Sequence, residues 1–287
     1  MSIREPAGPP GRPGAGEAPL GVIAGRGPLP LALIGAAKRH GRRVVCVDVF
    51  EGDPRLPAAA DAYCAMSPGN LGAILEALGR HGVREVLIAG KVDKLRVLHE
   101  ARFDAAGAAA AARLSDHRDT TIMNAFLAAL HGSGFHVGDQ ARYLRDVLPE
   151  RGVLTPRPPS ADEAADIDAG ARVAAQIAAL DIGQAVAIRR GAVVAVEAAE
   201  GTDAMIRRAG ALASGVVVVK VSRPAQDPRY DLPAVGRDTV RALIEAKASA
   251  LAVEAGRTLV LDREEVIAAA AEAGITVAAV SVPPPAG

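Results

Sequence analysis

The chain has 287 residues, half of them hydrophobic, and its 33 basic and 33 acidic side chains give a formal net charge of zero. A neutral chain with 2% aromatic residues and no tryptophan lacks the basic surface and the stacking platforms of a nucleic-acid-binding protein. Its two cysteines, Cys46 and Cys64, do not have the spacing of a metal-binding pair, and we expect reduced thiols and a cytoplasmic location.

Residues 1–18 are rich in proline and glycine and lack the apolar stretch of a signal peptide, so we expect a disordered tail there. No later segment reaches the roughly 20 apolar residues that a membrane-spanning helix needs. The longest β-branched run, GVVVV at 215–219, stops at Lys220. Any contact with a membrane is therefore expected to be peripheral.

Residues 19–155 alternate between short β-branched runs and segments with helical periodicity. This alternation predicts a parallel sheet with helices on both faces, and we interpret the region as a Rossmann-like domain. Strands are expected at 21–25, 44–49 and 85–90, and helices at 29–41, at 68–82 and, broken by polar turns, between 104 and 148.

A proline-rich linker, GVLTPRPPSADEAADID at 152–168, marks a domain boundary near residue 155, because Pro156, Pro158 and Pro159 forbid a regular helix. Residues 156–287 then predict a second, mixed α/β domain. Its expected elements are a helix near 163–180, a hairpin at 184–197 that turns at Arg190 and Gly191, a helix at 203–213, a strand at 215–221, a helix near 237–248, strands at 250–256 and 258–261, and a last helix and strand through Val280.

The segment GVIAGRGPLPLAL places a strand, a glycine turn at Gly25 and Gly27, and a helix start in succession. Such a turn could hold an anion at the helix N-terminus, or it could be a tight turn without a ligand. A dinucleotide fingerprint would need a third glycine where Pro30 stands, although Asp48 at the end of the next strand could meet ribose hydroxyls.

The segment IAGKV ends the third strand at the same predicted sheet edge. There Lys91 could contact a phosphate or a uracil carbonyl group, or it could be solvated.

The segment VEAAEGTDAMIRRAG gathers Glu197, Glu200 and Asp203 where a strand gives way to a helix. Thr202 could cap that helix, and Asp203 in its first turn would be favoured by the helix dipole. The two glutamates have no such structural role. Because Mg²⁺ needs only one or two carboxylates besides phosphate oxygens and water, the turn could hold a metal against a phosphoanhydride.

The segment VVKVSRPAQDPRYDLPAVG alternates cations and acids in a proline-punctuated loop. Phosphoryl transfer needs such groups to position charged oxygens and neutralise developing charge, although a solvated loop with surface ion pairs is the alternative. The charged and amide residues of this loop are Lys220, Arg223, Gln226, Asp227, Arg229 and Asp231. The histidines show no zinc-binding spacing.

Six segments, taken in order, resemble the LpxI-type UDP-2,3-diacylglucosamine pyrophosphatases from about Leu20 to Val280. They are GVIAGRGPLP, IAGKV, DIGQAV, VEAAEGTDAM, RPAQDPRYDLPAVG and EAGRTLVLDREEVI. The resemblance implies a nucleotide-binding N-terminal domain and a catalytic C-terminal domain in an enzyme of Gram-negative lipid A biosynthesis. It implies hydrolysis of UDP-2,3-diacylglucosamine to UMP and 2,3-diacylglucosamine 1-phosphate, called lipid X, with Mg²⁺ or another divalent cation such as Mn²⁺.

The resemblance also assigns site residues. It implies that Asp231 is essential, as a metal ligand or as the group that orients water, with Asp227 and Glu200 as second choices and Glu200 as a further metal ligand. Substrate contacts are expected from Gly25, Gly27, Ala89, Gly90, Gln184, Thr202, Asp203 and Lys220.

The lipid-linked UDP-sugar substrate is an amphiphile, so peripheral contact with the inner membrane is expected, and the chain could form a homodimer. Relatives often carry two adjacent acids where HRDTTIM here has only Asp119, with Asp116 upstream. Two alternatives stay open: a Rossmann-like NAD(P)-dependent oxidoreductase that uses Asp48, and a non-catalytic module that binds a UDP-sugar or lipid.

Overall fold

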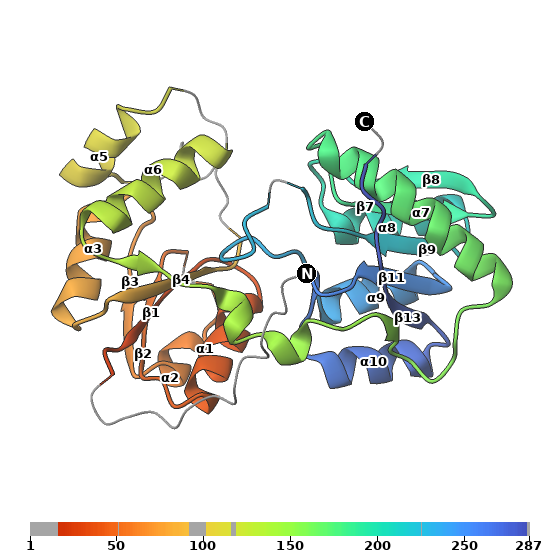
Figure 1. Cartoon of the computed structure of the whole chain (residues 1–287), viewed down its shortest axis with the longest axis horizontal. Coiled ribbons are helices and arrows are strands. Elements are labelled where there is room, and N and C mark those ends of the chain that lie inside the picture. Colours follow the sequence, from red (N-terminus) through yellow and green to blue (C-terminus); the bar gives the residue numbers. More distant parts are fainter. Residues whose placement is uncertain (1–16, 51, 92–101, 116–118, 225, 286–287) are drawn as a thin grey trace, which may run out of the picture. The chain divides into compact units, whose positions relative to one another are not determined.

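The computed structural model describes residues 17–50, 52–91, 102–115, 119–224 and 226–285 (Figure 1). The chain divides into two compact units, Met1–Tyr143 and Leu144–Gly287, and each has a sheet of its own. The expected tail at residues 1–18 lies almost wholly outside the described residues. Within them, no helix is both long and apolar enough to cross a membrane.

The N-terminal unit is built around a sheet with the strand order β3-β2-β1-β4-β5, in which every neighbouring pair is parallel. Its strands are β1 (Leu20–Ala24), β2 (Val44–Asp48), β3 (Ala62–Ala65), β4 (Glu85–Ala89) and β5 (His136–Val137). Its helices are α1 (Leu29–Arg39), α2 (Leu56–Ala59), α3 (Leu71–Arg80), α5 (Ala105–Ala111), α6 (Asp119–Gly132) and the 3-10 helix η1 (Gln140–Arg142). This arrangement confirms the predicted Rossmann-like parallel sheet.

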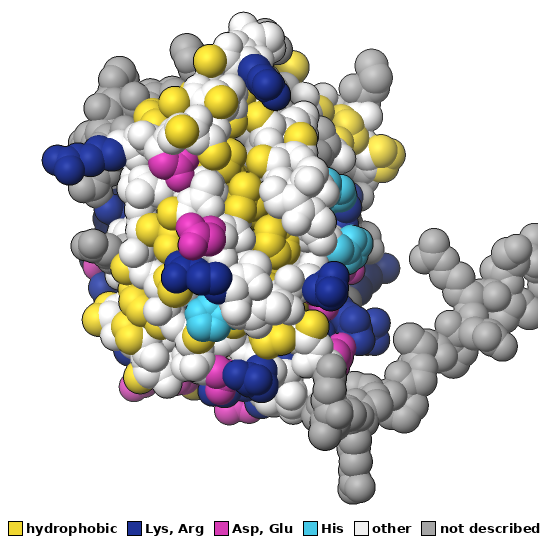
Figure 2. All heavy atoms as spheres, turned by 90° about the vertical axis from the view of Figure 1, so that its left-hand side faces the viewer, with side chains coloured by type: hydrophobic (Ala, Val, Ile, Leu, Met, Phe, Trp, Pro, Cys, Tyr) yellow, Lys and Arg dark blue, Asp and Glu magenta, His cyan; other side chains and the backbone are white. Residues whose placement is uncertain are grey.

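The central strands of this sheet are covered on both faces. Every residue of β1 and β2 is buried, which explains why their sequences are continuous apolar runs rather than alternating ones. Pro28 and Pro30 stand at the start of α1, where a missing N–H group costs no hydrogen bond. Figure 2 shows the face of this unit that carries α3 and α5, where apolar side chains gather between scattered charged groups.

The C-terminal unit has a mixed sheet, which confirms the predicted mixed α/β domain, and its strand order is β6-β13-β11-β9-β7-β8. β9, β11 and β13 are parallel, whereas β6, β7 and β8 run antiparallel to their neighbours. The strands are β6 (Gly152–Val153), β7 (Ala185–Arg189), β8 (Ala192–Val196), β9 (Val217–Lys220), β11 (Ala250–Glu254) and β13 (Thr276–Val280), with β10 (Ala234–Val235) and β12 (Leu259–Val260) paired separately. The helices are η2 (Arg145–Val147), α7 (Ala161–Ala179), α8 (Thr202–Leu212), α9 (Arg237–Glu245) and α10 (Arg263–Glu272).

Two apolar clusters cover the opposite faces of this sheet. Ile167 and Ala174 of α7 pack against Val217 and Val219 of β9. On the other face, residues of α8, α9 and α10 pack against alternate strand residues such as Val218. The period of two in β9 therefore decides which residues meet which helix layer.

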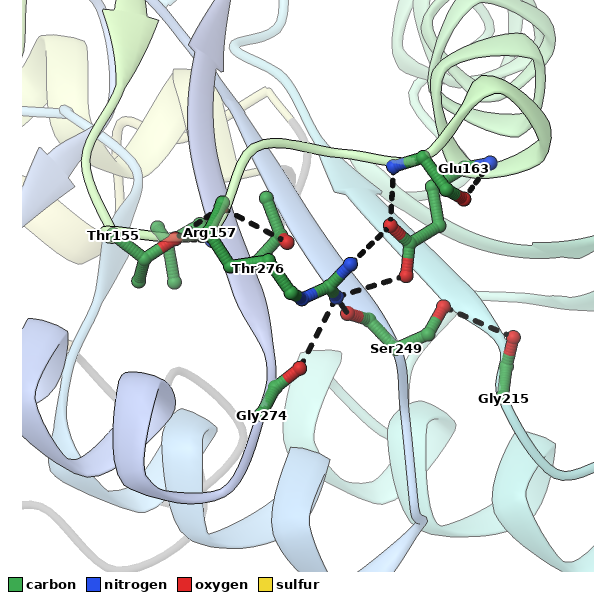
Figure 3. A network of polar contacts seen from close by, with 9 residues as sticks. Thr155, Arg157, Glu163, Gly215, Ser249, Gly274 and Thr276 are labelled. Atoms are coloured by element: carbon green, nitrogen blue, oxygen red, sulfur yellow. Dashed lines mark hydrogen bonds and ion pairs between the residues drawn. The ribbon is translucent and has the colours of Figure 1, made fainter.

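The proline-rich segment is held to the C-terminal unit by a polar network that we call the Arg157 clamp (Figure 3). The Arg157 guanidinium donates to both Glu163 carboxylate oxygens, over 2.8 and 3.0 Å, and to the carbonyl oxygens of Ser249 and Gly274, each over 3.1 Å. The Ser160 side chain and Glu163 form a capping box at the start of α7. The segment therefore begins α7 and joins the loops before β11 and β13.

Candidate active site

At the carboxyl edge of the N-terminal sheet, the turn after β1 is joined to the turn after β4. The Gly25 N–H donates to the Ala89 carbonyl oxygen over 2.7 Å. The Arg26 N–H donates to the Lys91 carbonyl oxygen over 2.9 Å, and the Lys91 N–H donates to the Arg26 carbonyl oxygen over 2.8 Å. Because β1 and β4 are neighbouring parallel strands, their ends meet at one edge. The structure thus brings together Gly25, Ala89 and Gly90.

Two of the glycines predicted to bind substrate have a structural explanation. A Cβ at Gly25 would lie 2.7 Å from the Lys91 carbonyl oxygen, and a Cβ at Gly90 would lie 2.8 Å from that of Arg26. Gly27 has a φ of +97°, and no described atom lies within 4 Å of the position where its Cβ would be. Of these three glycines, Gly27 is the one whose Cα faces open space, whereas those of Gly25 and Gly90 face neighbouring backbone atoms.

Asp48 has a structural role that the sequence did not reveal. It is 1% exposed, and its carboxylate accepts hydrogen bonds from the backbone N–H groups of Phe50 and Gly52 and from the Tyr63 hydroxyl. A carboxylate engaged in this way holds the loop after β2 and does not face outward to meet a ribose. The oxidoreductase alternative therefore loses the acid on which it depended.

The C-terminal sheet gathers polar residues from separate strands at one edge. β9 and β11 are parallel, so Lys220 and Glu254 stand at neighbouring carboxyl ends. Ala185 of the antiparallel strand β7 lies opposite Lys220, which places Gln184 at the same edge. β8, antiparallel to β7, brings Glu197 to this edge as well. The strand order and directions thus explain why Glu197, Lys220 and Glu254 meet at one sheet edge.

Hydrogen bonds join these groups into what we call the Glu197–Thr202–Lys220 chain. Lys220 Nζ donates to Thr202 Oγ1 and to the Ala234 carbonyl oxygen, each over 2.9 Å. The Thr202 hydroxyl donates to Glu197 Oε1 over 2.7 Å, and Glu197 Oε2 accepts from the Gln184 N–H over 3.2 Å. The residues Glu197, Thr202 and Lys220 are only 6–7% exposed. Buried charges are tolerated where they are hydrogen-bonded in this manner.

The Gln184 side chain adds a buried acceptor next to this chain. Its backbone N–H bonds Glu197 and its carbonyl oxygen accepts from Val221, but its side-chain Oε1 is buried and has no partner among the described residues. A buried acceptor without a donor costs about 1–3 kcal/mol. A ligand N–H or O–H group, or a water molecule, would satisfy it.

The start of α8 corrects one prediction from the sequence. Thr202 does not cap the helix: Gly201, with a φ of +82°, is the N-cap, there is no side-chain capping bond, and Thr202 is the first helical residue. Its hydroxyl is used by Glu197 and Lys220 instead. Asp203 does lie in the first turn, as predicted, and its Oδ1 accepts from the Thr239 hydroxyl of α9 over 2.9 Å.

Glu200 has different surroundings from Glu197. It forms an ion pair with Arg208 and accepts from the Ala198 N–H in its own turn. The Arg208 hydrogen bond lowers the pKa of the Glu200 carboxyl group. Of the two glutamates at this strand end, Glu197 is therefore the one that the fold places among the buried polar groups.

The loop after β9 carries the two aspartates predicted to be catalytic, and arginines hold both. Arg223 reaches Asp231 over 3.4 Å and Asp181 over 2.7 Å, and the Asp231 side chain is 46% exposed. Asp227 binds Arg229, whose hydrogen bonds lower the pKa of the Asp227 carboxyl group. The Asp231 N–H donates to the Asp227 carbonyl oxygen over 2.9 Å, so the two aspartates share one turn.

The donor groups near the predicted metal ligands limit how a metal ion could bind. Among the described residues, no group of three or more histidine, cysteine, aspartate or glutamate side chains is placed to hold a metal ion. Asp231 and Glu200, the predicted ligands, each pair with a different arginine. A Mg²⁺ ion that takes most of its ligands from phosphate and water needs only one or two carboxylates, and the partly exposed Asp231 can supply one.

Sequence reasoning missed Glu254, the last residue of β11. Its side chain is 13% exposed, and its Oε2 accepts from the Ser222 N–H over 2.7 Å, which fixes the start of the loop that carries Asp231. The sequence did carry a signal for Glu254: this acid directly follows the apolar run ALAV, at the carboxyl end of a strand. Asp116 lies outside the described residues.

A Rossmann-like domain followed by a mixed α/β domain, with polar groups gathered at strand ends in both, defines a two-domain α/β protein. In open α/β sheets, ligands commonly bind at the carboxyl ends of the strands. The family model of the LpxI N-terminal domain matches residues 19–147, and that of the LpxI C-terminal domain matches residues 150–278. The UDP-2,3-diacylglucosamine pyrophosphatase LpxI of Caulobacter vibrioides is 34% identical over 271 residues, which cover 90% of this chain and 96% of that protein. The chain therefore belongs to the LpxI family, which confirms the resemblance of its motifs.

Proposed function

We propose that this chain hydrolyses the pyrophosphate bond of UDP-2,3-diacylglucosamine to UMP and 2,3-diacylglucosamine 1-phosphate in Gram-negative lipid A biosynthesis. The observation that carries the proposal is the match to the Caulobacter vibrioides pyrophosphatase, which extends over 96% of that protein. The buried polar groups at the edge of the C-terminal sheet support it, because they are of the kind that phosphoryl transfer requires.

The proposed reaction is attack of water on the sugar-side phosphorus of the diphosphate. A new P–O bond forms to the water oxygen, the bond to the bridging oxygen breaks, and UMP leaves with that oxygen. Lys220 would neutralise phosphate charge, and the uncapped N–H groups at the start of α8 would donate to phosphate oxygens. Asp231 would orient the water and accept its proton, with Asp227 and Glu200 as second candidates.

Mg²⁺, or Mn²⁺, is proposed as the cofactor. It would supply charge neutralisation on the diphosphate. As a metal ligand, which is the alternative to its role toward water, Asp231 would contribute a carboxylate oxygen in place of its 3.4 Å contact with Arg223. Glu200 would be the second protein ligand only if it left Arg208. The ordinary preference of Mg²⁺ for a few carboxylates plus phosphate oxygens supports this assignment.

The N-terminal unit is proposed to bind the nucleotide portion. Gly27 leaves its backbone open to a ligand, and the exposed Lys91 stands at the same sheet edge. Gly25, Ala89 and Gly90 would then contribute by keeping the two turns close together, in addition to any contact of their own with the substrate.

Peripheral contact with the inner membrane is proposed for a cytoplasmic enzyme with an amphiphilic substrate. The apolar side chains of α6, among them Ile122, Met123 and Phe126, are only partly buried, and Phe103 is 40% exposed. Apolar side chains also gather on the face shown in Figure 2. Sedimentation with vesicles tests the contact, and the mass of the protein in solution tests a homodimer.

Asp231→Asn tests the proposed chemistry. We expect UMP release from UDP-2,3-diacylglucosamine to decrease by about 100-fold or more, as for the loss of a general base, with an unchanged circular dichroism spectrum. Asp238→Asn is the matched control, because Asp238 also lies 3.4 Å from an arginine, Arg241, but on the surface of α9. Equal activity of Asp231→Asn and Asp238→Asn would contradict the assignment. UMP release measured after addition of EDTA, and again after addition of Mg²⁺, tests whether the reaction depends on a metal ion.

A further inference from the structure

The Thr202 hydroxyl lies between the Glu197 carboxylate and the Lys220 ammonium group, and its hydrogen bonds have a direction. A hydroxyl group has one proton. Thr202 donates that proton to Glu197 Oε1 over 2.7 Å, so its lone pairs face Lys220 Nζ at 2.9 Å. While Glu197 accepts this proton, Thr202 does not donate to a phosphate oxygen. Its effect on a ligand is therefore exerted through Lys220.

The same carboxylate also fixes a second residue that is expected to bind substrate. Glu197 Oε2 accepts from the Gln184 N–H, and the Gln184 side chain carries the buried acceptor without a partner. Glu197 lies just past the end of β8, whereas Gln184 precedes β7 and Lys220 ends β9. One buried carboxylate thus holds groups from three segments in register at the sheet edge.

We propose that Glu197 is a positioning residue for the hydrolysis. It need not touch the substrate: it orients the Thr202 hydroxyl, which in turn accepts from Lys220, and it holds Gln184 against the same edge. This inference rests on the proposed function of the site. Small displacements of groups that position a reacting phosphate can reduce the rate about 100-fold, so the orientation of Lys220 has catalytic consequences.

Asp166 provides a matched comparison within the same unit. It is 2% exposed, and its two carboxylate oxygens accept from the backbone N–H groups of Arg190, over 2.8 Å, and Gly191, over 2.6 Å. Like Glu197, it is a buried carboxylate that holds the β7–β8 hairpin. It acts at the turn of the hairpin, however, which is the opposite end of β7 from Gln184. A purely structural role predicts the same behaviour for both acids.

The experiment compares Glu197→Gln with Asp166→Asn, using UMP release per folded molecule and thermal unfolding. Both substitutions should lower the melting temperature. Only Glu197→Gln should lower kcat, by about 10- to 100-fold, with KM changed by less than about threefold. The proposal is overturned if kcat of Glu197→Gln decreases no more than that of Asp166→Asn, or if only KM changes.

A second pair of variants keeps the test available if Glu197→Gln does not fold. Thr202→Val preserves the shape of the side chain but removes the hydroxyl, and Thr202→Ser keeps the hydroxyl. We expect Thr202→Ser to restore most of the kcat that Thr202→Val loses, and equal kcat values for these two variants would overturn the proposal. Failure of the wild-type chain to release UMP would instead refute the proposed function, so the two failures are distinguishable.

Discussion

The Arg157 clamp leads to a quantitative stability prediction. Arg157→Ala removes the bonds of 2.8 and 3.0 Å to Glu163 and the two bonds of 3.1 Å to the carbonyl oxygens of Ser249 and Gly274. Glu163, which is 7% exposed, would lose both bonds from the guanidinium and keep the bond that its carboxylate accepts from the Ser160 N–H. Hydrogen bonds to charged groups contribute about 1.5–3 kcal/mol each, but the Arg157 side chain is 44% exposed and water can replace part of them. We expect the free energy of unfolding to decrease by about 2–3 kcal/mol.

Urea unfolding followed by circular dichroism measures this loss, because the chain has no tryptophan to report by fluorescence. The control is Arg207→Ala. Arg207 pairs with Glu245 over 2.6 Å, but each side chain is 47% exposed, so about 0–1 kcal/mol is expected. If Arg157→Ala shifts the unfolding of the C-terminal unit no further than Arg207→Ala does, the clamp contributes no more than a surface ion pair.

Three further predictions concern Glu163, Gly25 and Cys46. Burial raises the pKa of Glu163, but hydrogen bonds from Arg157 and Ser160 outweigh it and hold the pKa below its ordinary value. Its stabilisation is therefore present above the unfolded pKa and lost as the pH falls through the folded one, so acid titration should destabilise Glu163→Gln less than wild type. Gly25→Ala should destabilise the N-terminal unit by about 1–3 kcal/mol in urea unfolding, whereas Gly35→Ala, in the interior of α1 with no backbone atom in the way, should stabilise it by about 0.5–1 kcal/mol. Burial raises the pKa of Cys46 to about 12, so a thiol reagent should modify it only after unfolding.

Much of the fold could be predicted from periodicity. The apolar runs that became β1, β2 and β4 are continuous because helices cover both sheet faces. In the second domain, Gly191 indicated the hairpin turn, and in the structure both Arg190 and Gly191 have a positive φ there. The two-residue strands β5, β6 and β10 were missed because they leave no periodic signal, and the four-residue strand β3 was missed as well. They depend on pairing with a neighbour that is distant in the sequence, which local patterns do not encode.

The candidate site was less predictable, because partners decide what a carboxylate does. The sequence places Glu197 and Glu200 three residues apart and gives no reason to distinguish them. In the structure Glu197 is buried with Thr202, while Glu200 pairs with Arg208. Asp48 likewise has the spacing of a ribose-binding acid, but its carboxylate accepts hydrogen bonds from N–H groups of the loop that follows β2. Such differences arise from tertiary contacts and not from spacing.

Hydrolysis of UDP-2,3-diacylglucosamine in labelled water is the most direct test of the central claim. We predict that the purified chain releases UMP, that the labelled oxygen enters 2,3-diacylglucosamine 1-phosphate, and that Asp231→Asn decreases the release by about 100-fold or more. Absence of UMP release by the wild-type chain with Mg²⁺ or Mn²⁺ present would contradict the proposed function, and label in UMP would contradict attack at the sugar-side phosphorus.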